Sequence, residues 1–260
     1  MSITLIHGDC TLALLPGYNS VITDPPYSEF VHKNATSQSR GGGVRHRDLG
    51  FDCLSTELRG SIARMVARAT KWSAVFSDTE GFHLWIEACK TVGATYVRGL
   101  PWCRFSMPSL CKWPPQGMEL IGAFYGTAKG PKRWPGPGNH IAYTHKALRG
   151  EDKHKAEKPL DLMLELVTHF TLPGDIVLDP CAGSGTTGLA CKLLGRDFVG
   201  YEIDETWALK AQERLARDTL SERDEERYRR WLESQETAKA DAARRKNHTA
   251  KIRAKLDSQG

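Results

Sequence analysis

The stretch GDIVLDPCAGSGTTGLACKLLGRDFVGYEID, residues 174–204, joins a short apolar run, a glycine-rich turn, a helical pattern and a second apolar run that ends in an acid. Gly183, Gly185 and Gly188 follow the first run. Glycine lets a backbone turn sharply and approach a ligand closely, and the terminal acid, Glu202, can accept hydrogen bonds from both hydroxyls of a ribose. The stretch therefore predicts a strand–turn–helix–strand unit that binds a nucleoside cofactor.

The acid at the end of the first run restricts which nucleoside we expect. A dinucleotide would place its anionic pyrophosphate at the helix N-terminus. Asp179 stands just before the glycines, and its carboxylate would oppose a pyrophosphate. A cofactor that carries an ammonium and a sulfonium suits this position better. The pattern favours S-adenosyl-L-methionine and disfavours an NAD-dependent oxidoreductase.

Short apolar runs alternate with helical patterns along most of the chain. This alternation is typical of an α/β fold in which helices cover both faces of a parallel sheet. We expect strands at 3–6, 20–23, 73–77, 94–102, 118–126, 175–178 and 197–201, and helices at about 55–70, 80–92 and 159–170, from about 186 and from about 205.

A second motif, SVITDPPYS at residues 20–28, places an acid, two prolines and an aromatic ring at the end of a buried strand. Prolines end the strand because they donate no hydrogen bond to a sheet. DPPY at 24–27, together with LDPCAGSGTT and GRDFVGYE, resembles the β group of DNA amino-methyltransferases, in which a catalytic DPPY precedes the glycine motif. The resemblance covers roughly residues 3–210.

The resemblance implies a Rossmann-like methyltransferase fold with a circularly permuted motif order. Its sheet has seven strands, of which one is antiparallel and the others are parallel, and we assign the antiparallel strand to 118–126. It also implies a set of residues around S-adenosyl-L-methionine, of which Asp9 contacts the adenine and the segment at 158–159 closes over the methionine end. The set comprises Asp9, Lys158, Pro159, Asp179, Cys181, Gly183, Gly185, Thr186 and Glu202. Cys181 departs from the family, which usually has phenylalanine there.

The DPPY residues suit the chemistry of an exocyclic amine, whose lone pair is delocalised into the base. Two acceptors aimed at its N–H bonds would stabilise the positive charge that develops during methyl transfer. Asp24 supplies one acceptor and the carbonyl of Pro25 the other, directed by Pro26. Tyr27 offers a ring for stacking. A base inside a duplex cannot reach such a pocket, so the target must be flipped out or single-stranded, and we expect a flipped base in double-stranded DNA.

The identity of the base and of the nucleic acid stays open. In the family, Asp as the first motif residue goes with adenine N6, which we therefore expect. A cytosine-N4 DNA methyltransferase and an RNA adenine-N6 methyltransferase are the alternatives, since the amine clamp does not read the sugar. A DNA-binding protein with an inactive methyltransferase fold is disfavoured by the intact motifs.

The chain is expected to divide into a catalytic domain at 1–218 and a charged, basic helical extension at 219–260. Residues 28–53 form a long glycine-rich loop, expected to be flexible, and 127–157 is the candidate target-recognition element. Candidate DNA contacts in these two segments are Arg40, Arg45, Arg47, Lys132, Arg133 and Trp134. The extension suits either DNA or the second subunit of a homodimer, and the sequence does not choose between them.

Composition sets the remaining expectations. The net charge of +5 is mild and favours a polyanionic partner. The seven cysteines form no CxxC pair, so we expect a reducing compartment and no metal site. No apolar stretch is long enough for a membrane span, and no signal-peptide pattern is present. We expect a cytoplasmic protein of a prokaryote or phage, of the restriction-modification type.

Overall fold

The computed structural model describes residues 1–12, 17–29, 31, 36–38, 44–46, 53–103, 117–128, 133–138, 141–146 and 157–257. The chain divides into two compact units, Met1–Asp218 and Thr219–Gly260. In the first unit the structure has β1 (Ile3–His7), η1 (Cys10–Leu12), β2 (Ser20–Thr23), β3 (Thr36–Gln38), β4 (Val44–His46), α2 (Thr56–Arg68), β5 (Trp72–Ser77), α3 (Phe82–Thr91), β6 (Thr95–Cys103), β7 (Met118–Tyr125), α4 (Leu160–Phe170), β8 (Ile176–Asp179), α5 (Thr186–Leu194), β9 (Asp197–Glu202) and α6 (Glu205–Ala216).

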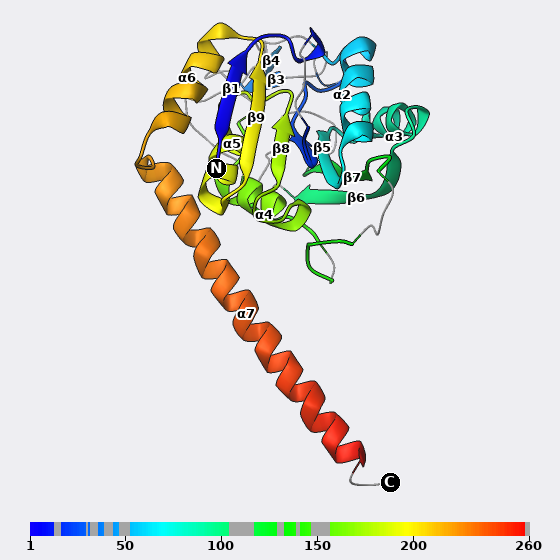
Figure 1. Ribbon diagram of the computed structural model, residues 1–260, viewed down its shortest axis with the longest axis vertical. Helices are drawn as coiled ribbons and strands as arrows, with labels where there is room; N and C mark the ends of the chain where they lie inside the picture. Colours follow the sequence, from blue (N-terminus) through cyan, green and yellow to red (C-terminus); the bar gives the residue numbers. More distant parts are fainter. Residues whose placement is uncertain are drawn as a thin grey trace. The chain divides into compact units, whose positions relative to one another are not determined.

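Seven strands form one sheet in the order β1-β9-β8-β2-β5-β7-β6 (Figure 1). β7 runs antiparallel to both of its neighbours, and the other strand pairs are parallel. This arrangement confirms the expected methyltransferase-type sheet and the assignment of 118–126 as its reversed strand.

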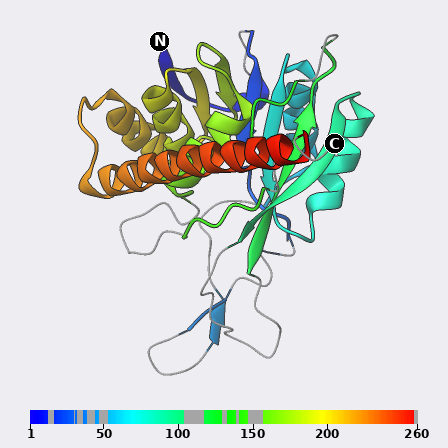
Figure 2. The ribbon, with the colours of Figure 1, turned by 90° about the horizontal axis from the view of Figure 1, so that it is seen from below.

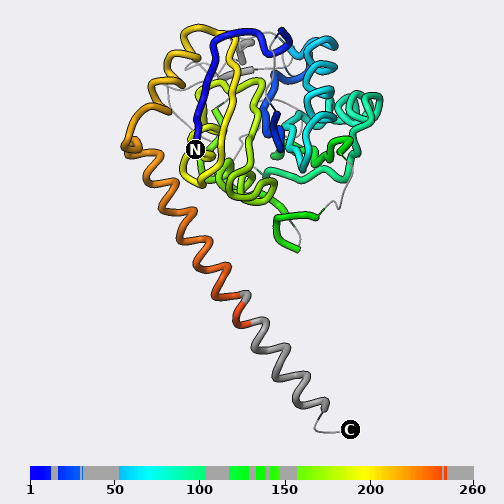
Figure 3. Tube along the Cα trace, viewed as in Figure 1, coloured from blue at the N-terminus to red at the C-terminus, as the bar shows by residue number. Residues whose placement is uncertain are grey.

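The permuted order follows from the position of the first strand. β1 pairs with β9, from Ile3 beside Phe198 to His7 beside Glu202, so the N-terminal strand lies next to the last strand of the sheet in the chain (blue beside yellow in Figure 3). β8 pairs with β2 in parallel, with Val21 beside Leu178. The glycine turn and the DPPY turn therefore leave adjacent strands at the same edge of the sheet.

The middle of the sheet is buried on both faces because its strands are apolar without alternation. Val21 belongs to a core cluster with residues of α2 and α3, such as Ile62 and Trp85. Ile22 points to the other face and is equally buried, and α4 contacts β2. α4 packs on α5, and α5 and α6 contact β1 and β9.

Residues 28–53 contain a feature that the sequence analysis missed. β3 and β4 pair antiparallel, Thr36 with His46 and Gln38 with Val44, in a two-stranded sheet of their own (Figure 2). Each strand has only three residues of mixed polarity, which is too short for a period-two pattern to be recognised. The sequence analysis predicted no strand within 28–53, and these six residues are strands.

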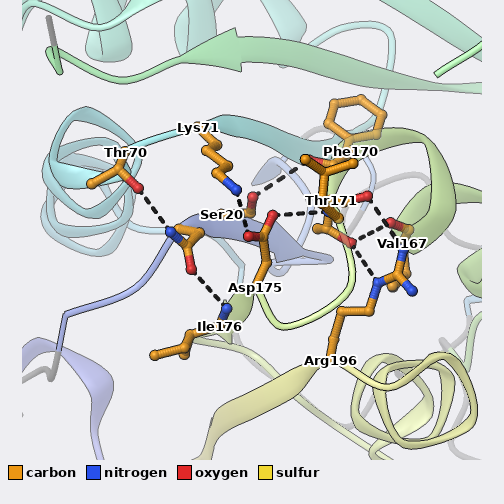
Figure 4. A network of polar contacts seen from close by, with 11 residues as sticks. Ser20, Thr70, Lys71, Val167, Phe170, Thr171, Asp175, Ile176 and Arg196 are labelled. Carbon is orange, nitrogen blue, oxygen red and sulfur yellow. Dashed lines mark hydrogen bonds and ion pairs between the residues drawn. The ribbon is translucent and has the colours of Figure 1, made fainter. Parts of the chain in front are cut away.

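A polar network joins chain segments at the amino edge of the sheet, away from both motifs (Figure 4). The Asp175 carboxylate accepts hydrogen bonds from Lys71 Nζ at 2.5 Å and from the Leu172 N–H at 2.8 Å. Asn19 Oδ1 accepts from the Ile176 N–H at 2.8 Å. These contacts tie the starts of β2, β5 and β8 together, so this edge is occupied by structural hydrogen bonds.

The second unit is one helix over the described residues, α7 (Glu222–Asp257). Ser221 and Asp224 cap its start: the Asp224 N–H donates to Ser221 Oγ at 3.2 Å, and Ser221 Oγ donates to Asp224 Oδ2 at 3.0 Å. Tyr228 stacks on Trp231. Within the part of the chain that the structure describes, no helix has the length and apolar character that crossing a membrane requires.

Replacing Gly126 by alanine should destabilise the first unit. A Cβ at this position would lie 1.9 Å from the backbone carbonyl oxygen of Ala69, which cannot rotate away. We expect a loss of about 3 kcal/mol in the free energy of unfolding, at the upper end of the range for overpacking. Gly17→Ala is the control, since no described atom lies within 4 Å of the point that its Cβ would occupy. Equal urea midpoints for both variants would contradict this packing.

Candidate active site

The ends of several strands bring the sequence motifs to one edge of the sheet. Asp24 follows β2, the glycine turn follows β8, Glu202 ends β9, and Asp9 lies two residues beyond β1. Ligands of open α/β sheets bind at the carboxyl ends of the strands, where the connections diverge. The fold therefore collects residues from opposite ends of the chain in one place.

The glycine turn has the conformation that its residues predict. Gly183 and Gly185 have φ angles of 52° and 77°, in the left-handed region that other residues avoid. Gly185 is the N-cap of α5, and a Cβ there would lie 3.1 Å from Ala211 Cβ. Gly188 packs under the ring of Phe198, where a Cβ would lie 2.7 Å from a ring carbon. The turn is shaped by close backbone packing.

Asp179 lies beneath this turn. Its carboxylate accepts hydrogen bonds from Thr187 Oγ1 at 2.6 Å and from the Cys181 N–H at 3.1 Å, and the residue is only 2% exposed. Burial raises the pKa of Asp179 to about 6, against the lowering effect of these hydrogen bonds. The contacts favour a role in holding the turn rather than the direct cofactor contact that the resemblance implied.

Glu202 holds the other side of the turn. Its Oε2 accepts from the Gly183 N–H at 2.8 Å and its Oε1 from the Asp204 N–H at 2.9 Å. The backbone carbonyl of Glu202 accepts from the Gly8 N–H at 2.9 Å, which brings the exposed Asp9 to the same end of the sheet. Each carboxylate oxygen retains a second lone pair, so Glu202 can still accept a ligand hydroxyl.

An arginine that no motif indicated connects two parts of this site. Arg214 of α6 donates to the Ser184 carbonyl and to Thr186 Oγ1, both at 3.1 Å, and pairs with Glu157 at 3.2 Å. Glu157 directly precedes Lys158. Arg214 therefore holds the segment before α4 against the glycine turn. Only its tertiary contacts reveal this role, because it lies on an ordinary amphipathic helix.

Lys158 bonds the acid of the DPPY motif. Its Nζ lies 2.5 Å from Asp24 Oδ2 and 3.0 Å from Tyr27 Oη, and the residue is 7% exposed. The same ammonium lies over the rings of Tyr27, Phe76 and Trp102 at 4.9 to 5.7 Å. The resemblance implied a cofactor contact for Lys158, whereas in the structure its ammonium bonds Asp24. Pro159 follows as the N-cap of α4.

A second acid, Glu119, completes this group and was missed by the sequence analysis. Its Oε2 accepts from the Tyr27 hydroxyl and lies 3.4 Å from Lys158 Nζ. Burial raises the pKa of Asp24 to about 6, with Lys158 lowering it and Glu119 raising it. Asp24 Oδ1 is buried and has no hydrogen-bond partner among the described residues. The only sequence signal for Glu119 was a single acid in the apolar run MELIGAFY.

The turn after Tyr27 is held by Asp78, which follows β5. Its carboxylate accepts from the Ser28 N–H at 2.9 Å and from Ser28 Oγ at 3.1 Å. The Gly81 N–H donates to it as well, at 2.5 Å. The Tyr27 carbonyl accepts from the Leu54 N–H at 3.0 Å. These bonds hold the chain on the far side of Pro25 and Pro26, so the DPPY turn is anchored at both of its ends.

The structure describes the side chains of only two of the six candidate DNA contacts, Arg133 and Trp134. Arg40, Arg47 and Lys132 lie outside the described residues, and of Arg45 only the backbone is described. The ring of Trp134 packs edge-on against Trp72 and Phe170, with centroids 5.1 and 5.0 Å apart, and the Arg133 carbonyl accepts from Trp72 Nε1. Trp72 begins β5, so Arg133 and Trp134 lie at the opposite edge of the sheet from Asp24.

The chain belongs to a family of DNA methylases, the N6_N4_Mtase family, which matches residues 71–213. The matched range contains Glu119, Lys158 and the glycine turn. Asp24 and Tyr27 lie before its first residue.

Two curated relatives match shorter segments. The type II methyltransferase M.HindIII of Haemophilus influenzae is 52% identical over 66 residues, 25% of this chain and 21% of that protein. The type II methyltransferase M2.DpnII of Streptococcus pneumoniae is 39% identical over 72 residues, 28% of this chain and 27% of that protein. The matched segments thus span about a fifth to a quarter of these relatives.

Solved structures match over a greater length. The crystal structure of the M1.HpyAVI–SAM complex has a TM-score of 0.62 and 25% identity over 82% of this chain and 99% of that chain. PvuII DNA methyltransferase, described as cytosine-N4-specific, has a TM-score of 0.59 and 16% identity over 88% of this chain and 92% of that chain. The second likeness concerns the fold alone.

Asp179→Asn should stabilise the protein in a pH-dependent way. The pKa of about 6 in the folded state lies above the ordinary 3.8, so the ionised carboxylate is unfavourable in the folded state at neutral pH. We expect a gain of about 1–3 kcal/mol in the free energy of unfolding at pH 8, which vanishes near pH 4 where Asp179 is protonated. Urea unfolding across this range measures it, with the exposed Asp218→Asn as control. A loss of stability at every pH would mean that the charge itself holds the turn.

Proposed function

We propose that this chain is an S-adenosyl-L-methionine-dependent methyltransferase that methylates the exocyclic N6 of adenine in DNA at specific sites. The observation that carries the proposal is the juxtaposition of Asp24 and the glycine turn on the neighbouring strand, with one buried oxygen of Asp24 left without a hydrogen-bond partner among the described residues. Membership of the DNA methylase family supports the reaction class.

The residues around the glycine turn fit the proposed cofactor. Glu202 presents carboxylate oxygens for ribose hydroxyls, and Asp9 presents an exposed carboxylate at the neighbouring strand end. Gly183 and Gly185 allow close approach of the backbone. When bound, S-adenosyl-L-methionine supplies an electrophilic methyl group. The likeness to the M1.HpyAVI–SAM complex supports this cofactor.

The DPPY turn binds the nucleophile of the reaction, which is the exocyclic amine of the target base. Asp24 Oδ1 accepts one N–H of the target amine and the Pro25 carbonyl accepts the other, which localises the lone pair on nitrogen and stabilises the positive charge that develops there. The ring of Tyr27 stacks on the base. Asp24 is ionised at neutral pH, since its pKa is about 6, so it can accept this N–H.

The substrate is DNA, and the target base leaves the helix. The Asp24 side chain is only 17% exposed, so an amine reaches it by insertion and not from within a stacked duplex. We propose that 127–157 recognises the target sequence and that Arg40, Arg45, Arg47 and Lys132 contact phosphate. Arg133 and Trp134 are left out of this proposal, because they lie at the opposite edge of the sheet from Asp24. The extension at 219–260 is proposed to bind DNA or a second subunit.

Cytosine N4 is the second candidate target. The family includes N4 enzymes, and the fold is shared with a cytosine-N4-specific neighbour. The preference for adenine rests on Asp24 as the first residue of the motif. RNA is a third candidate substrate, since neither Asp24 nor Tyr27 contacts the sugar in the proposed clamp.

Asp24→Ala should abolish methyl transfer and leave cofactor affinity nearly unchanged, because the carboxylate acts mainly in the transition state. Asp24→Ser should retain slight activity, since a hydroxyl still accepts one hydrogen bond. Labelled S-adenosyl-L-methionine, offered with duplex DNA, single-stranded DNA or RNA, measures the rate, and nucleoside analysis identifies the base. Full turnover by Asp24→Ala would refute the clamp, and labelled cytosine or RNA would favour the alternatives.

Glu202→Ala should weaken binding of S-adenosyl-L-methionine. The loss of one or two hydrogen bonds to a charged acceptor, each about 1.5–3 kcal/mol, corresponds to at least a tenfold rise in Kd. Calorimetric titration measures the change. Glu205→Ala is the matched control, because Glu205 is an exposed acid in the first turn of α6. Equal affinities of the two variants would remove Glu202 from the cofactor site.

A further inference from the structure

Glu119 is a buried acid at the carboxyl edge of the sheet. β7 runs antiparallel to β5, so its first residues lie beside the end of that strand, with Leu120 opposite Ser77. On the other side Glu119 pairs with Trp102 at the end of β6. The residue is only 3% exposed. Because an isolated buried carboxylate is strongly unfavourable, its partners indicate why the position tolerates it.

Two of its partners are Tyr27, which belongs to the proposed amine clamp, and Lys158, which pairs with Asp24 of that clamp. The Tyr27 hydroxyl donates to Glu119 Oε2 and accepts from Lys158 Nζ at 3.0 Å. Lys158 Nζ also lies 3.4 Å from Glu119 Oε2 and 2.5 Å from Asp24 Oδ2. The ammonium of Lys158 is thus shared by Asp24 and Glu119. The Tyr27 hydroxyl is fixed in direction, because it donates to Glu119 and accepts from Lys158.

Within the described residues, Asp24 and Glu119 both lie against the ammonium of Lys158, at 2.5 and 3.4 Å. The positive charge of Lys158 is therefore divided between two acids rather than given to Asp24 alone. An acid that is only partly compensated in this way favours a further positive partner. An amine that gains positive charge during methyl transfer is such a partner, and Asp24 Oδ1 is a buried acceptor that the described part of the chain leaves without one.

We propose that Glu119 is a positioning residue for methyl transfer, which acts through Lys158 and Tyr27 to orient Asp24 and to divide the charge of Lys158 between two acids. This inference rests on the proposed function and deepens it. Glu119 itself does not touch the target. It holds Lys158 so that this ammonium does not fully neutralise Asp24, and it holds the Tyr27 hydroxyl so that the stacking ring stays in place.

The role predicts a specific pH signature. Among the described residues, the titratable groups that interact with Asp24 are Lys158 before α4, Glu119 on β7, Tyr27 in its own turn, Asp179 at the end of β8 and Cys181 just beyond it. Burial and Glu119 raise the pKa of Asp24, and Lys158 lowers it. Removing the charge of Glu119 should lower this pKa, so the acid limb of the pH–rate profile should move to lower pH.

Glu119→Gln tests the proposal, because glutamine keeps the shape and an acceptor for Tyr27 but removes the charge. We expect the single-turnover rate at pH 8 to fall about tenfold to a hundredfold and the acid limb to move down by about half a unit or more. Calorimetric affinity for S-adenosyl-L-methionine should stay within about twofold. Glu119→Asp, which retains the charge, should keep the acid limb in place. An unchanged rate and limb in Glu119→Gln would reduce Glu119 to a packing role.

Two further measurements keep the proposal separate from the proposed function. If the wild-type chain methylates no nucleic acid, the proposed function fails, and carboxyl ¹³C NMR then compares the titration of Asp24 in wild type and Glu119→Gln. A lower midpoint in the variant supports the proposal, and an identical midpoint overturns it.

If Glu119→Gln does not fold, Tyr27→Phe breaks the same hydrogen-bond chain and keeps the ring. A rate reduced by about tenfold supports the proposal, and a wild-type rate overturns it.

Discussion

The buried ion pair between Lys158 and Asp24 is the contact on which the candidate site depends. It joins residues 134 positions apart in the sequence, from the start of α4 and the end of β2. Two charges of this kind are stable away from water only when each is paired and hydrogen-bonded. Lys158 satisfies this condition through Asp24, Tyr27 and Glu119 together. The position of α4, the shape of the DPPY turn and the charge around Asp24 are therefore linked.

The carboxyl and amino edges of the sheet differ in how their polar groups are used. At the carboxyl edge, strand ends diverge, and the buried Asp24 Oδ1 has no hydrogen-bond partner among the described residues. At the amino edge, Asp175 and Asn19 use their polar atoms to bind neighbouring segments. Trp134 belongs to the second edge through its contacts with Trp72 and Phe170. The basic and aromatic residues of 127–157, the proposed target-recognition element, therefore do not all lie at the edge that carries Asp24.

The glycine turn is held by side chains that hydrogen-bond its backbone and need not touch a ligand. Asp179 and Glu202 bond the backbone of the glycine turn from two sides. Arg214 bonds the same turn and, through Glu157, the segment that carries Lys158. The cofactor half and the amine half of the site are therefore mechanically connected through α6 and the start of α4.

The order of strands and helices was predictable from sequence because it depends on local patterns. Runs such as SVIT at 20–23 and the helical spacing at 159–170 reflect burial along one element, and Gly183 and Gly185 reflect a backbone conformation of their own. Glu119, Asp78 and Arg214 carry no such local signal, because their roles arise from contacts with residues far away in the chain. Lys158 was recognised by its motif, but its partner was not. The pairing of charges in a buried site depends on which strand ends meet, and only the tertiary structure decides that.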